Sequence, residues 1–411
     1  MTKMRIINLL TPFRSGIYQF HCNLLPGLVE RGCSVTWLSS GSSHAHLVAA
    51  GDAVFGDGEV VAPDTDDIVV RTRALVERVS EISPDVVICP ALGDPVELNA
   101  IRYLSAAIHR ILILHATSLA TYRGARAVRD HVNATVAICP RIEQDLISSY
   151  KFQPDKLHLI PHGIDTAAYA SRALSDSMNG HVRILSHGRV VDDQKGIFWL
   201  PKILSELARH TDKWECTISG DGPDLAELKR RFAQTRFSDR INFTGWTAPE
   251  DVPKLMSQHD VFLFPTKYEG NPIALIEAMA SGCVPVASRL PGVTDWIIED
   301  GVSGFQFPVG EIQSAVRHLL WLLSNRPQLG TLRLQARESV SKYSLDRMAE
   351  QYYRLLCEVQ SRPGQIRPAE HLDKCELAEG LRPAWWYRFP DPIKARLRLL
   401  RERVRTSVRV P

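Results

Sequence analysis

The chain has 411 residues, of which 45% are hydrophobic and 23% charged, a composition that is typical of globular proteins and excludes an intrinsically disordered one. Its length predicts two domains with an extension. The formal net charge is +3, but residues 382–411 alone contain nine Lys/Arg and two Asp/Glu, so the rest of the chain is slightly acidic. With an acidic body and no recognised nucleic-acid-reading motif, a nucleic-acid partner is not expected.

The eight cysteines are spaced singly, without a Cys-x-x-Cys pair or a zinc-ligand spacing. This pattern favours buried free thiols in a reducing cytosol. No uncharged apolar run reaches the roughly 18 residues that a membrane-spanning helix needs. The N-terminus, MTKMRIINLL, enters strand-like sequence directly and lacks the pattern of a signal peptide. We therefore expect a cytoplasmic protein.

In the first half of the chain, apolar runs of strand length alternate with helical periodicity. Helices are expected between the runs, for example at 18–31 and 95–109. Strands that are apolar on both faces and separated by helices predict a parallel sheet covered on both sides. The expected strands are 5–10, 34–40, 85–90, 110–116 and 134–140.

The same alternation restarts after a short polar segment, 171–181, which we interpret as the hinge between two domains. After about residue 309 the pattern is helical to about residue 362. The predicted fold class is α/β, with two doubly wound Rossmann-like domains. The second series of strands is expected at 182–188, 215–222, 241–245, 261–266 and 284–288. The expected divisions are 1–175, 176–345, a helical segment 346–381 and a basic tail 382–411.

The most informative stretch is Asp260–Gly304, which predicts a buried strand, a loop, a helix and a second buried strand. Parallel α/β folds bind nucleotides where a strand ends and a helix begins. Pro272 suits the first helical turn and leaves the next amides, from Ile273 on, available to an anion. Glu277, more than a turn further on, can accept both hydroxyls of a ribose, and Glu269 can reach hydroxyls beyond the phosphates. A solvated helix face is the alternative for the two glutamates.

A second candidate loop is SHGRVVDDQKG, which follows the strand ending near residue 186. It presents Gly188, Arg189 and Lys195, and two cations on a glycine-containing loop suit a diphosphate whose charge grows as it leaves. An ordinary charged surface loop is the alternative. The later SGDGP turn lacks the third glycine of the dinucleotide-binding fingerprint, and no P-loop sequence is present.

A metal ion is not expected at this site. Asp64 and Asp66 match the Asp-x-Asp spelling of metal-dependent transferases, but they lie in a polar segment far from the candidate loops in sequence. Arg189, Lys195 and a helix N-terminus can already stabilise a departing anion. We interpret the Asp-x-Asp match as coincidental.

Several short motifs occur in order: PHGID (161–165), HGRVVDDQKG, GDGP, INFTGW, EGNPIALIEAMASGCVPVAS and PGVTDWIIEDGVSG. Together they resemble the nucleotide-sugar half of the retaining GT-B glycosyltransferases of family 4, closely over 160–310 and more loosely over 1–360. The resemblance implies two Rossmann-like domains facing a central cleft.

By position, the resemblance assigns Arg189 and Lys195 to the donor diphosphate, with Gly188 in the same loop. It assigns Glu277 to the ribose and Glu269 to the donor sugar. Many relatives have Glu-Gly-Phe-Gly where this chain has Glu-Gly-Asn-Pro, which leaves the identity of the sugar open. The resemblance also assigns the backbone from Gly270 to Ile273, which includes Asn271 and Pro272, to the phosphate and the sugar.

In the first half, the resemblance is weaker. Gly16 stands where the family has a glycine-rich turn against the diphosphate, although TPFRSG contains a single glycine. His115, at the end of RILILHA, stands where the family often places a histidine against the donor sugar. A structural histidine at the end of an apolar strand is the alternative.

The resemblance implies a metal-independent, retaining hexosyltransferase that uses a nucleotide-diphosphate sugar as substrate and needs no cofactor. The acceptor would be a glycan or a lipid-linked glycan in cell-surface polysaccharide or glycolipid biosynthesis. Two alternatives stay open: a nucleotide-sugar epimerase or hydrolase of the same architecture, and a non-catalytic nucleotide- or glycan-binding scaffold.

The basic tail, 382–411, carries a second pattern. On a helical wheel one stripe contains Ile393, Leu397 and Leu400, flanked by Lys and Arg, and Trp385 and Trp386 precede it. A basic amphipathic helix led by aromatic residues is typical of attachment to an anionic membrane surface, here the inner face of the plasma membrane. A helix docked on the protein's own body and a disordered arm are the alternatives.

Overall fold

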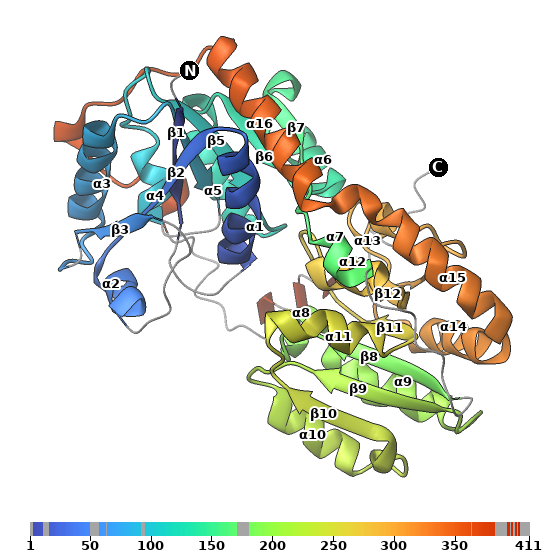
Figure 1. Ribbon diagram of the computed structural model, residues 1–411. Helices are drawn as coiled ribbons and strands as arrows, with labels where there is room; N and C mark the ends of the chain where they lie inside the picture. The colour runs from blue at the N-terminus through green and yellow to red at the C-terminus, as the bar shows by residue number, and fades with distance from the viewer. Residues whose placement is uncertain are drawn as a thin grey trace. The chain divides into compact units, whose positions relative to one another are not determined.

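The residues of the chain form two compact units, each containing one parallel sheet (Figure 1). The first unit consists of Met1–Gly163 and Leu345–Tyr387, and the second of Ile164–Ser344 and Arg388–Pro411. The computed structural model describes residues 3–10, 16–49, 57–62, 64–91, 95–170, 181–362 and 364–382, and positions 393, 394, 396, 397, 399, 400 and 402.

The first unit is built on a seven-stranded parallel sheet in the order β3-β2-β1-β4-β5-β6-β7. The central strands are almost entirely buried, as their uninterrupted apolar runs predict. The strands are β1 Met4–Leu9, β2 Cys33–Ser40, β3 Gly58–Val61, β4 Val86–Pro90, β5 His109–Leu114, β6 Ala134–Ala137 and β7 Leu157–Leu159.

Helices from both ends of the sequence cover this sheet. α16, although it follows the second sheet in the chain, packs against α1. The helices of the unit are α1 Gly16–Glu30, α2 Ser42–Ala49, α3 Ile68–Ile82, α4 Pro95–Ala100, α5 Leu119–Val128, α6 Pro140–Ser148 and α16 Leu345–Ser361, with the short turns η1 Arg129–His131, η2 Pro154–Lys156, η7 Leu372–Lys374 and η8 Glu379–Leu381.

The second unit contains a six-stranded parallel sheet in the order β10-β9-β8-β11-β12-β13. Its strands are β8 Val182–His187, β9 Trp214–Ser219, β10 Ile241–Gly245, β11 Val261–Phe264, β12 Val284–Ser288 and β13 Phe305–Phe307. Its helices are α7 Thr166–Ala170, α8 Asp192–Lys195, α9 Leu200–Leu207, α10 Leu225–Ala233, α11 Val252–Ser257, α12 Ile273–Ala280, α13 Thr294–Ile297, α14 Ile312–Ser324 and α15 Arg326–Ser339, with the turns η3 Ile197–Trp199, η4 Ser238–Arg240 and η5 Pro249–Asp251; η6 Ser341–Tyr343 follows α15.

The expected fold class, two doubly wound parallel α/β domains, is confirmed. Each of the ten expected strands is present, and three short ones, β3, β7 and β13, were not expected. All three lie at sheet edges and are largely half-buried or exposed, so they lack the continuous apolar run that marks a central strand.

A buried ionic clamp fixes the base of the second sheet. Asp260, which precedes β11 and is 2% exposed, accepts hydrogen bonds from the main chain and guanidinium of Arg183 in β8 at 2.8–3.1 Å. Arg333 of α15 donates to the same carboxylate at 2.9 Å. The clamp ties β8 to β11 and α15, and so fixes the register of the two strands whose opposite ends carry the candidate site.

The division between the units differs from the expected boundary at 175/176, because it falls between Gly163 and Ile164. Ile164 and Tyr169 are buried in the core of the second unit, beside residues of α11 and α12. At the other end, α16 belongs with the first unit. The apolar contacts of these segments, which lie far apart in sequence, therefore place the boundary ahead of the polar segment 171–181, most of which lies outside the described residues.

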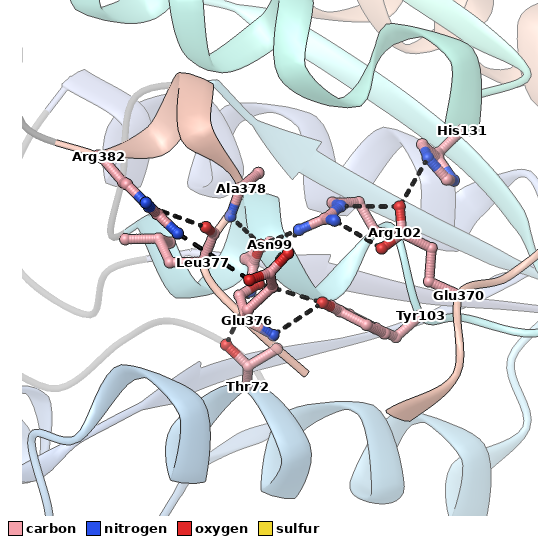
Figure 2. A network of polar contacts seen from close by, with 10 residues as sticks. All are labelled: Thr72, Asn99, Arg102, Tyr103, His131, Glu370, Glu376, Leu377, Ala378 and Arg382. Carbon is pink, nitrogen blue, oxygen red and sulfur yellow. Dashed lines mark hydrogen bonds and ion pairs between the residues drawn. The ribbon is translucent and has the colours of Figure 1, made fainter. Parts of the chain in front are cut away.

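After α16 the chain forms an extended strap, residues 364–382, across the first unit (Figure 2). Arg102 pairs with both carboxylate oxygens of Glu370 and also donates to the carbonyl oxygen of Glu376. The buried amide of Asn99 donates to the same carbonyl at 3.1 Å and accepts from the amide of Ala378 at 3.2 Å. These polar bonds to main-chain and side-chain groups help to fix the strap on the first unit.

Candidate functional site

The candidate site of the second unit lies at the carboxyl ends of β8 and β11. These strands are neighbours in the sheet although they are far apart in sequence, and the chain continues outward from them in opposite directions, to β9 and to β12. Ligands of open α/β sheets bind outside the carboxyl ends of the strands at such a switch point. The two loops that leave here contain Gly188–Lys195 and Pro265–Glu269, which are the two candidate loops of the sequence.

The structure brings Lys195 and Glu269 together as an ion pair. The Lys195 ammonium donates to Oε1 of Glu269 at 2.7 Å, and their side chains are 18% and 6% exposed. The hydroxyl of Thr266 donates to the same oxygen at 2.8 Å, and the amide of Gln194 contacts Oε2 at 3.3 Å. The pair therefore joins α8 to the loop after β11. The sequence did not predict that the two side chains contact each other.

The pair also has an aromatic neighbour. The Lys195 ammonium lies 5.3 Å from the ring centre of Phe264, the last residue of β11, at a distance where a ring face attracts a cation. A second lysine, Lys267, lies in the loop after β11 and pairs with Asp192 at 2.7 Å. Two part-buried lysines thus stand at one edge of the sheet, each with its own carboxylate.

Arg189 differs from both lysines. Its guanidinium donates to the neutral side-chain oxygen of Gln194 at 2.7 Å. Within the described part of the chain it forms no ion pair with a carboxylate. An exposed guanidinium on a loop at the end of a strand is suited to bind the oxygens of a diphosphate.

The backbone beside Arg189 is shaped by glycine. Gly188 has φ +135°, a region that favours glycine, and a Cβ at this position would point into open space. A Cβ added to Gly220 would lie only 1.9 Å from the carbonyl oxygen of Gly188. Glycine at 220 therefore lets the main chains after β8 and β9 approach each other closely. Gly188 thus offers a bare stretch of main chain to a ligand.

His187, the last residue of β8, is neutral in this environment. Its Nδ1 lies 3.0 Å from the hydroxyl of Ser219, which in turn hydrogen-bonds to Thr247 at 2.8 Å. Burial, together with the nearby Lys195 charge, lowers the pKa of His187 to about 4. His187 therefore does not add a positive charge to the site at neutral pH.

The start of α12 provides fewer amides to an anion than the sequence predicts. Pro272 is the N-cap of the helix, which begins at Ile273. The amide of Ile273 donates to the carbonyl oxygen of Asn271 at 2.9 Å, and that of Leu275 to Pro272 at 2.9 Å. Both were expected to be unpaired, and this expectation is wrong because the tight turn at Asn271-Pro272 places carbonyl oxygens within their reach.

The side chain of Asn271 presents a different polar group. Its Oδ1 and Nδ2 are both buried, and neither has a hydrogen-bond partner among the described residues. A buried amide without partners costs free energy. Gly270 and Asn271 form the short link between Glu269 and α12, so this amide belongs to the same loop as the ion pair.

Glu277, in the second turn of α12, has a partner that the sequence did not indicate. The hydroxyl of Tyr169 in α7 donates to its Oε1 at 2.6 Å. Burial raises the pKa of the half-buried Glu277, although the Tyr169 hydrogen bond opposes this shift. The two residues are separated by more than a hundred positions, so no local spacing could have paired them.

The remaining candidates belong to the first unit. Gly16 is the first residue of α1, and 11–15 before it lie outside the described residues. His115 directly follows β5, and its Nδ1 lies 3.0 Å from Nε2 of His162 in the PHGID segment. Burial, together with His162, lowers the pKa of His115 well below its usual value. His162 is the neighbour that sequence reasoning missed.

Over the described ranges, no group of three or more His, Cys, Asp and Glu side chains is arranged to hold a metal ion. Asp66, of the Asp-x-Asp match, accepts a hydrogen bond from Ser42 at 2.8 Å. Nor does any helix in these ranges combine the length and apolar character needed to cross a membrane.

Comparison with known proteins matches both halves of the chain to family models. Residues 175–343 match "Glycosyl transferases group 1" and residues 15–168 match "Glycosyltransferase Family 4". A solved structure of HepE from Anabaena in complex with UDP and glucose is similar in fold, with a TM-score of 0.68, 16% sequence identity, and coverage of 86% of this chain and all of that one.

Two relatives place the similarity in more detail. The chain is 26% identical over 279 residues to the amylovoran biosynthesis glycosyltransferase AmsK of Erwinia amylovora, covering 63% of this chain and 67% of the relative. It is 24% identical over 177 residues to an Escherichia coli UDP-Gal:α-D-GlcNAc-diphosphoundecaprenol α-1,3-galactosyltransferase, covering 41% and 45%. The match thus spans less than half of the second relative.

Proposed function

Because this chain belongs to the glycosyl transferases of group 1 and has the GT-B fold, we propose that it transfers a hexose-type sugar from a nucleoside diphosphate donor to a glycan or lipid-linked acceptor. The proposal includes retention of the anomeric configuration and no requirement for a metal ion. The observation that carries it is the Lys195–Glu269 pair beside Arg189 at the carboxyl ends of two neighbouring strands.

Arg189 and Lys195 would bind the diphosphate. When the bond between the sugar and the diphosphate breaks, negative charge grows on the leaving phosphate, and fixed cations stabilise this charge more in the transition state than in the bound donor. Arg189 has no carboxylate partner among the described residues, and Gly188 lets the donor approach the main chain. Two cations make a divalent ion unnecessary for this step.

Glu269 would bind the donor sugar. A carboxylate has about four lone-pair positions, so Glu269 can accept a sugar hydroxyl while it holds Lys195 and Thr266. The same pair then connects the two parts of the donor, because Lys195 faces the diphosphate and Glu269 the sugar. A shift of the sugar would move Glu269 and, through the ion pair, change the position of the Lys195 ammonium that stabilises the leaving group.

Glu277 would hold the ribose. Tyr169 donates to Oε1 and fixes the carboxylate, and Oε2 can accept from a ribose hydroxyl. Burial makes ionisation of the Glu277 carboxyl costly and so raises its pKa, and hydrogen bonds from a diol offset that cost when the donor binds.

The acceptor hydroxyl would attack from the face that the diphosphate leaves. In this front-face mechanism the new sugar–oxygen bond forms as the phosphate departs, and the acceptor proton passes to a phosphate oxygen. The protein's contribution is then orientation and electrostatic stabilisation, which together can supply most of the rate enhancement.

The proposal is tested first by binding and then by product analysis. In a thermal-shift panel of UDP-, GDP- and other nucleotide sugars, one class of donor should raise the melting temperature of the protein, because a ligand that binds the folded state stabilises that state. NMR of the first-formed product should show the donor's own anomeric configuration. Inversion would contradict the retaining mechanism, and activity abolished by EDTA and restored by a divalent ion would contradict metal independence.

An incubation without acceptor separates the alternatives. Rapid donor hydrolysis or epimerisation under these conditions would favour an enzyme of that type. Donor binding without turnover, with every acceptor tested, would favour a scaffold. Rapid transfer only when a glycan or lipid-linked acceptor is added is the result we expect.

The basic tail supports an acceptor at a membrane surface. Ile393, Leu397 and Leu400 form one stripe, and their side chains are 43%, 56% and 58% exposed. Exposed apolar side chains at helical spacing argue against a helix whose apolar face is docked on the body. Together with the excess of Lys and Arg in 382–411, they fit an anionic lipid surface.

Co-sedimentation with vesicles that contain anionic lipid tests this part. A chain ending at Leu381 should lose vesicle binding. The full-length variant Ile393→Ser/Leu397→Ser/Leu400→Ser keeps the charges of the tail. It should bind the vesicles weakly, and this binding should be strongly sensitive to salt. Equal binding by the truncated and full-length chains would remove the membrane proposal while leaving the transfer reaction untouched.

A further inference from the structure

The first unit contains a pair of histidines whose ring nitrogens face each other. Nδ1 of His115 and Nε2 of His162 are 3.0 Å apart, a hydrogen-bonding distance. The outer nitrogens, Nε2 of His115 and Nδ1 of His162, are buried and have no partner among the described residues. The pair is therefore a short chain of two rings with one shared hydrogen bond and two open ends.

Aromatic and polar contacts hold the pair in place. The ring of Phe20 in α1 lies 5.0 Å from that of His115 and 5.1 Å from that of His162, and Tyr352 of α16 packs on Phe20 at 5.6 Å. Next to His162, the carbonyl oxygen of Gly163 accepts from the side chain of an α1 asparagine at 3.1 Å. Phe20 of α1 thus contacts the His162 ring directly, and Tyr352 of α16 supports that contact through Phe20.

Both rings are neutral at physiological pH, because the surroundings are apolar. Burial lowers the pKa of His162 to about 4 and that of His115 well below its usual value. A neutral imidazole carries one N–H, so the shared bond has two arrangements. Either His115 donates from Nδ1 and leaves its Nε2 as an acceptor, or His162 donates from Nε2 and makes Nε2–H of His115 the outward-facing donor.

The two arrangements differ in what they leave unsatisfied. If His115 donates, the buried Nδ1–H of His162 has no acceptor, and a ligand at His115 does not relieve it. If His162 donates, the N–H at the open end is that of His115, which a ligand oxygen can accept, and His162 retains only an unpaired lone pair. Because a buried N–H without acceptor is rarer in proteins than an under-used acceptor, the second arrangement is favoured once a ligand is bound.

We propose that His162 is a positioning residue: through its Nε2–H it fixes His115 as the Nε2–H tautomer, so that His115 presents a hydrogen-bond donor to a hydroxyl oxygen of the donor sugar. This inference rests on the proposed function for the identity of the ligand. The tautomer of His115 is measured with a nucleoside diphosphate sugar bound, so the measurement does not require transfer.

Ring ¹⁵N shifts of histidine-labelled protein report the tautomer. The His115 signals can be assigned by their absence in His115→Gln. In the wild type with a nucleoside diphosphate sugar bound, Nδ1 of His115 should have the shift of an unprotonated nitrogen and Nε2 that of a protonated one. His162→Phe keeps a ring but removes the N–H, so the tautomer preference of His115 should weaken or reverse. His162→Gln, whose amide can donate to the same nitrogen, should restore it.

Transfer assays give the second readout. His162→Phe should lower kcat by about tenfold, the order that one hydrogen bond supplies, with a smaller effect on the donor KM, and His162→Gln should recover most of it. Melting temperatures of both variants serve as the control for folding. An unchanged His115 tautomer in a folded His162→Phe would overturn the proposal, and so would Gln failing to restore the tautomer. If no nucleotide sugar supports transfer by the wild type, the proposed function fails, whereas the ¹⁵N comparison still decides the role of His162.

Discussion

The two sheets carry candidate residues at the carboxyl ends of their strands, but they do so with opposite electrostatic strategies. In the second unit the groups are ionised, as in the Lys195–Glu269 pair and the exposed Arg189. In the first unit His115 and His162 are neutral and packed on Phe20. The Lys195–Glu269 pair and the outer nitrogens of the histidine pair are both largely buried, so burial alone does not decide the charge of a group.

The difference lies in the partners. Lys195 and Glu269 remain ionised at low exposure because each compensates the other and Thr266 adds a hydrogen bond. Among the described residues the histidines have no carboxylate beside them, so burial lowers the pKa of both, and the neighbouring His162 lowers the pKa of His115 further. One unit is therefore equipped to bind an anion, and the other to hydrogen-bond an uncharged group such as a sugar hydroxyl.

The largest effect should come from the ionised site. In the proposed mechanism Lys195→Ala removes a cation from the leaving diphosphate, and it leaves the carboxylate of Glu269 buried without its ammonium, so we expect kcat to fall about 10³-fold. The matched control is Lys267→Ala, which removes a lysine of similar burial that pairs with Asp192 instead. Comparable losses in the two variants, measured by steady-state transfer kinetics, would show that general loss of a surface lysine, and not the diphosphate contact, is responsible.

An intermediate effect is expected at the neutral site. His115→Leu removes one pre-positioned hydrogen-bond donor, which should lower kcat/KM about 10²-fold without changing the binding of the nucleoside diphosphate alone. His158→Leu, at a half-buried histidine of β7, is the control. Isothermal titration with the nucleoside diphosphate tests the second half of the expectation. Equal loss of nucleotide affinity would place His115 at the phosphates and abolish the contrast between the two units.

The sequence was sufficient for the features that repeat or lie close together in the chain. Apolar runs revealed the central strands of both sheets, because burial on two faces leaves an uninterrupted signal. The order of Arg189, Lys195, Glu269 and Glu277 predicted a candidate site in the second unit, since strand ends and helix starts are visible locally. The short edge strands β3, β7 and β13 escaped because partial exposure removes that signal.

What the sequence could not supply was the pairing of groups across long separations. Three contacts depend on which strands and helices become neighbours. They are the ion pair of Lys195 with Glu269, the hydrogen bond that the Tyr169 hydroxyl donates to Glu277, and the contact between the ring nitrogens of His162 and His115. The directions of the amides after Pro272 depend on one tight turn, in which the residue type fixes the φ of Pro272 but not its ψ. For the same reason, the amides of Ile273 and Leu275 were wrongly expected to be unpaired.

The smallest expected effect tests whether burial or pairing controls Glu277. Because its folded pKa is raised above the unfolded value of about 4.3, the folded state binds the proton more tightly than the unfolded state. The resulting stability is fully present below the unfolded pKa and is lost as pH rises through the folded pKa. Glu277→Gln keeps an acceptor for Tyr169 but cannot ionise, so it should melt higher than the wild type near neutral pH, and the difference should vanish toward about pH 4.

The same variant should bind the donor about tenfold more weakly, because a neutral amide is a poorer acceptor for a ribose diol than a carboxylate. Tyr169→Phe serves as the comparison, since it removes the hydroxyl and keeps the carboxylate; without that hydrogen bond the pKa of Glu277 should rise further. Melting curves across this pH range are the measurement. A Glu277→Gln variant that is less stable than the wild type near neutral pH would show that pairing with Tyr169 outweighs burial, and Glu277 would then belong with the compensated charges of the Lys195–Glu269 pair.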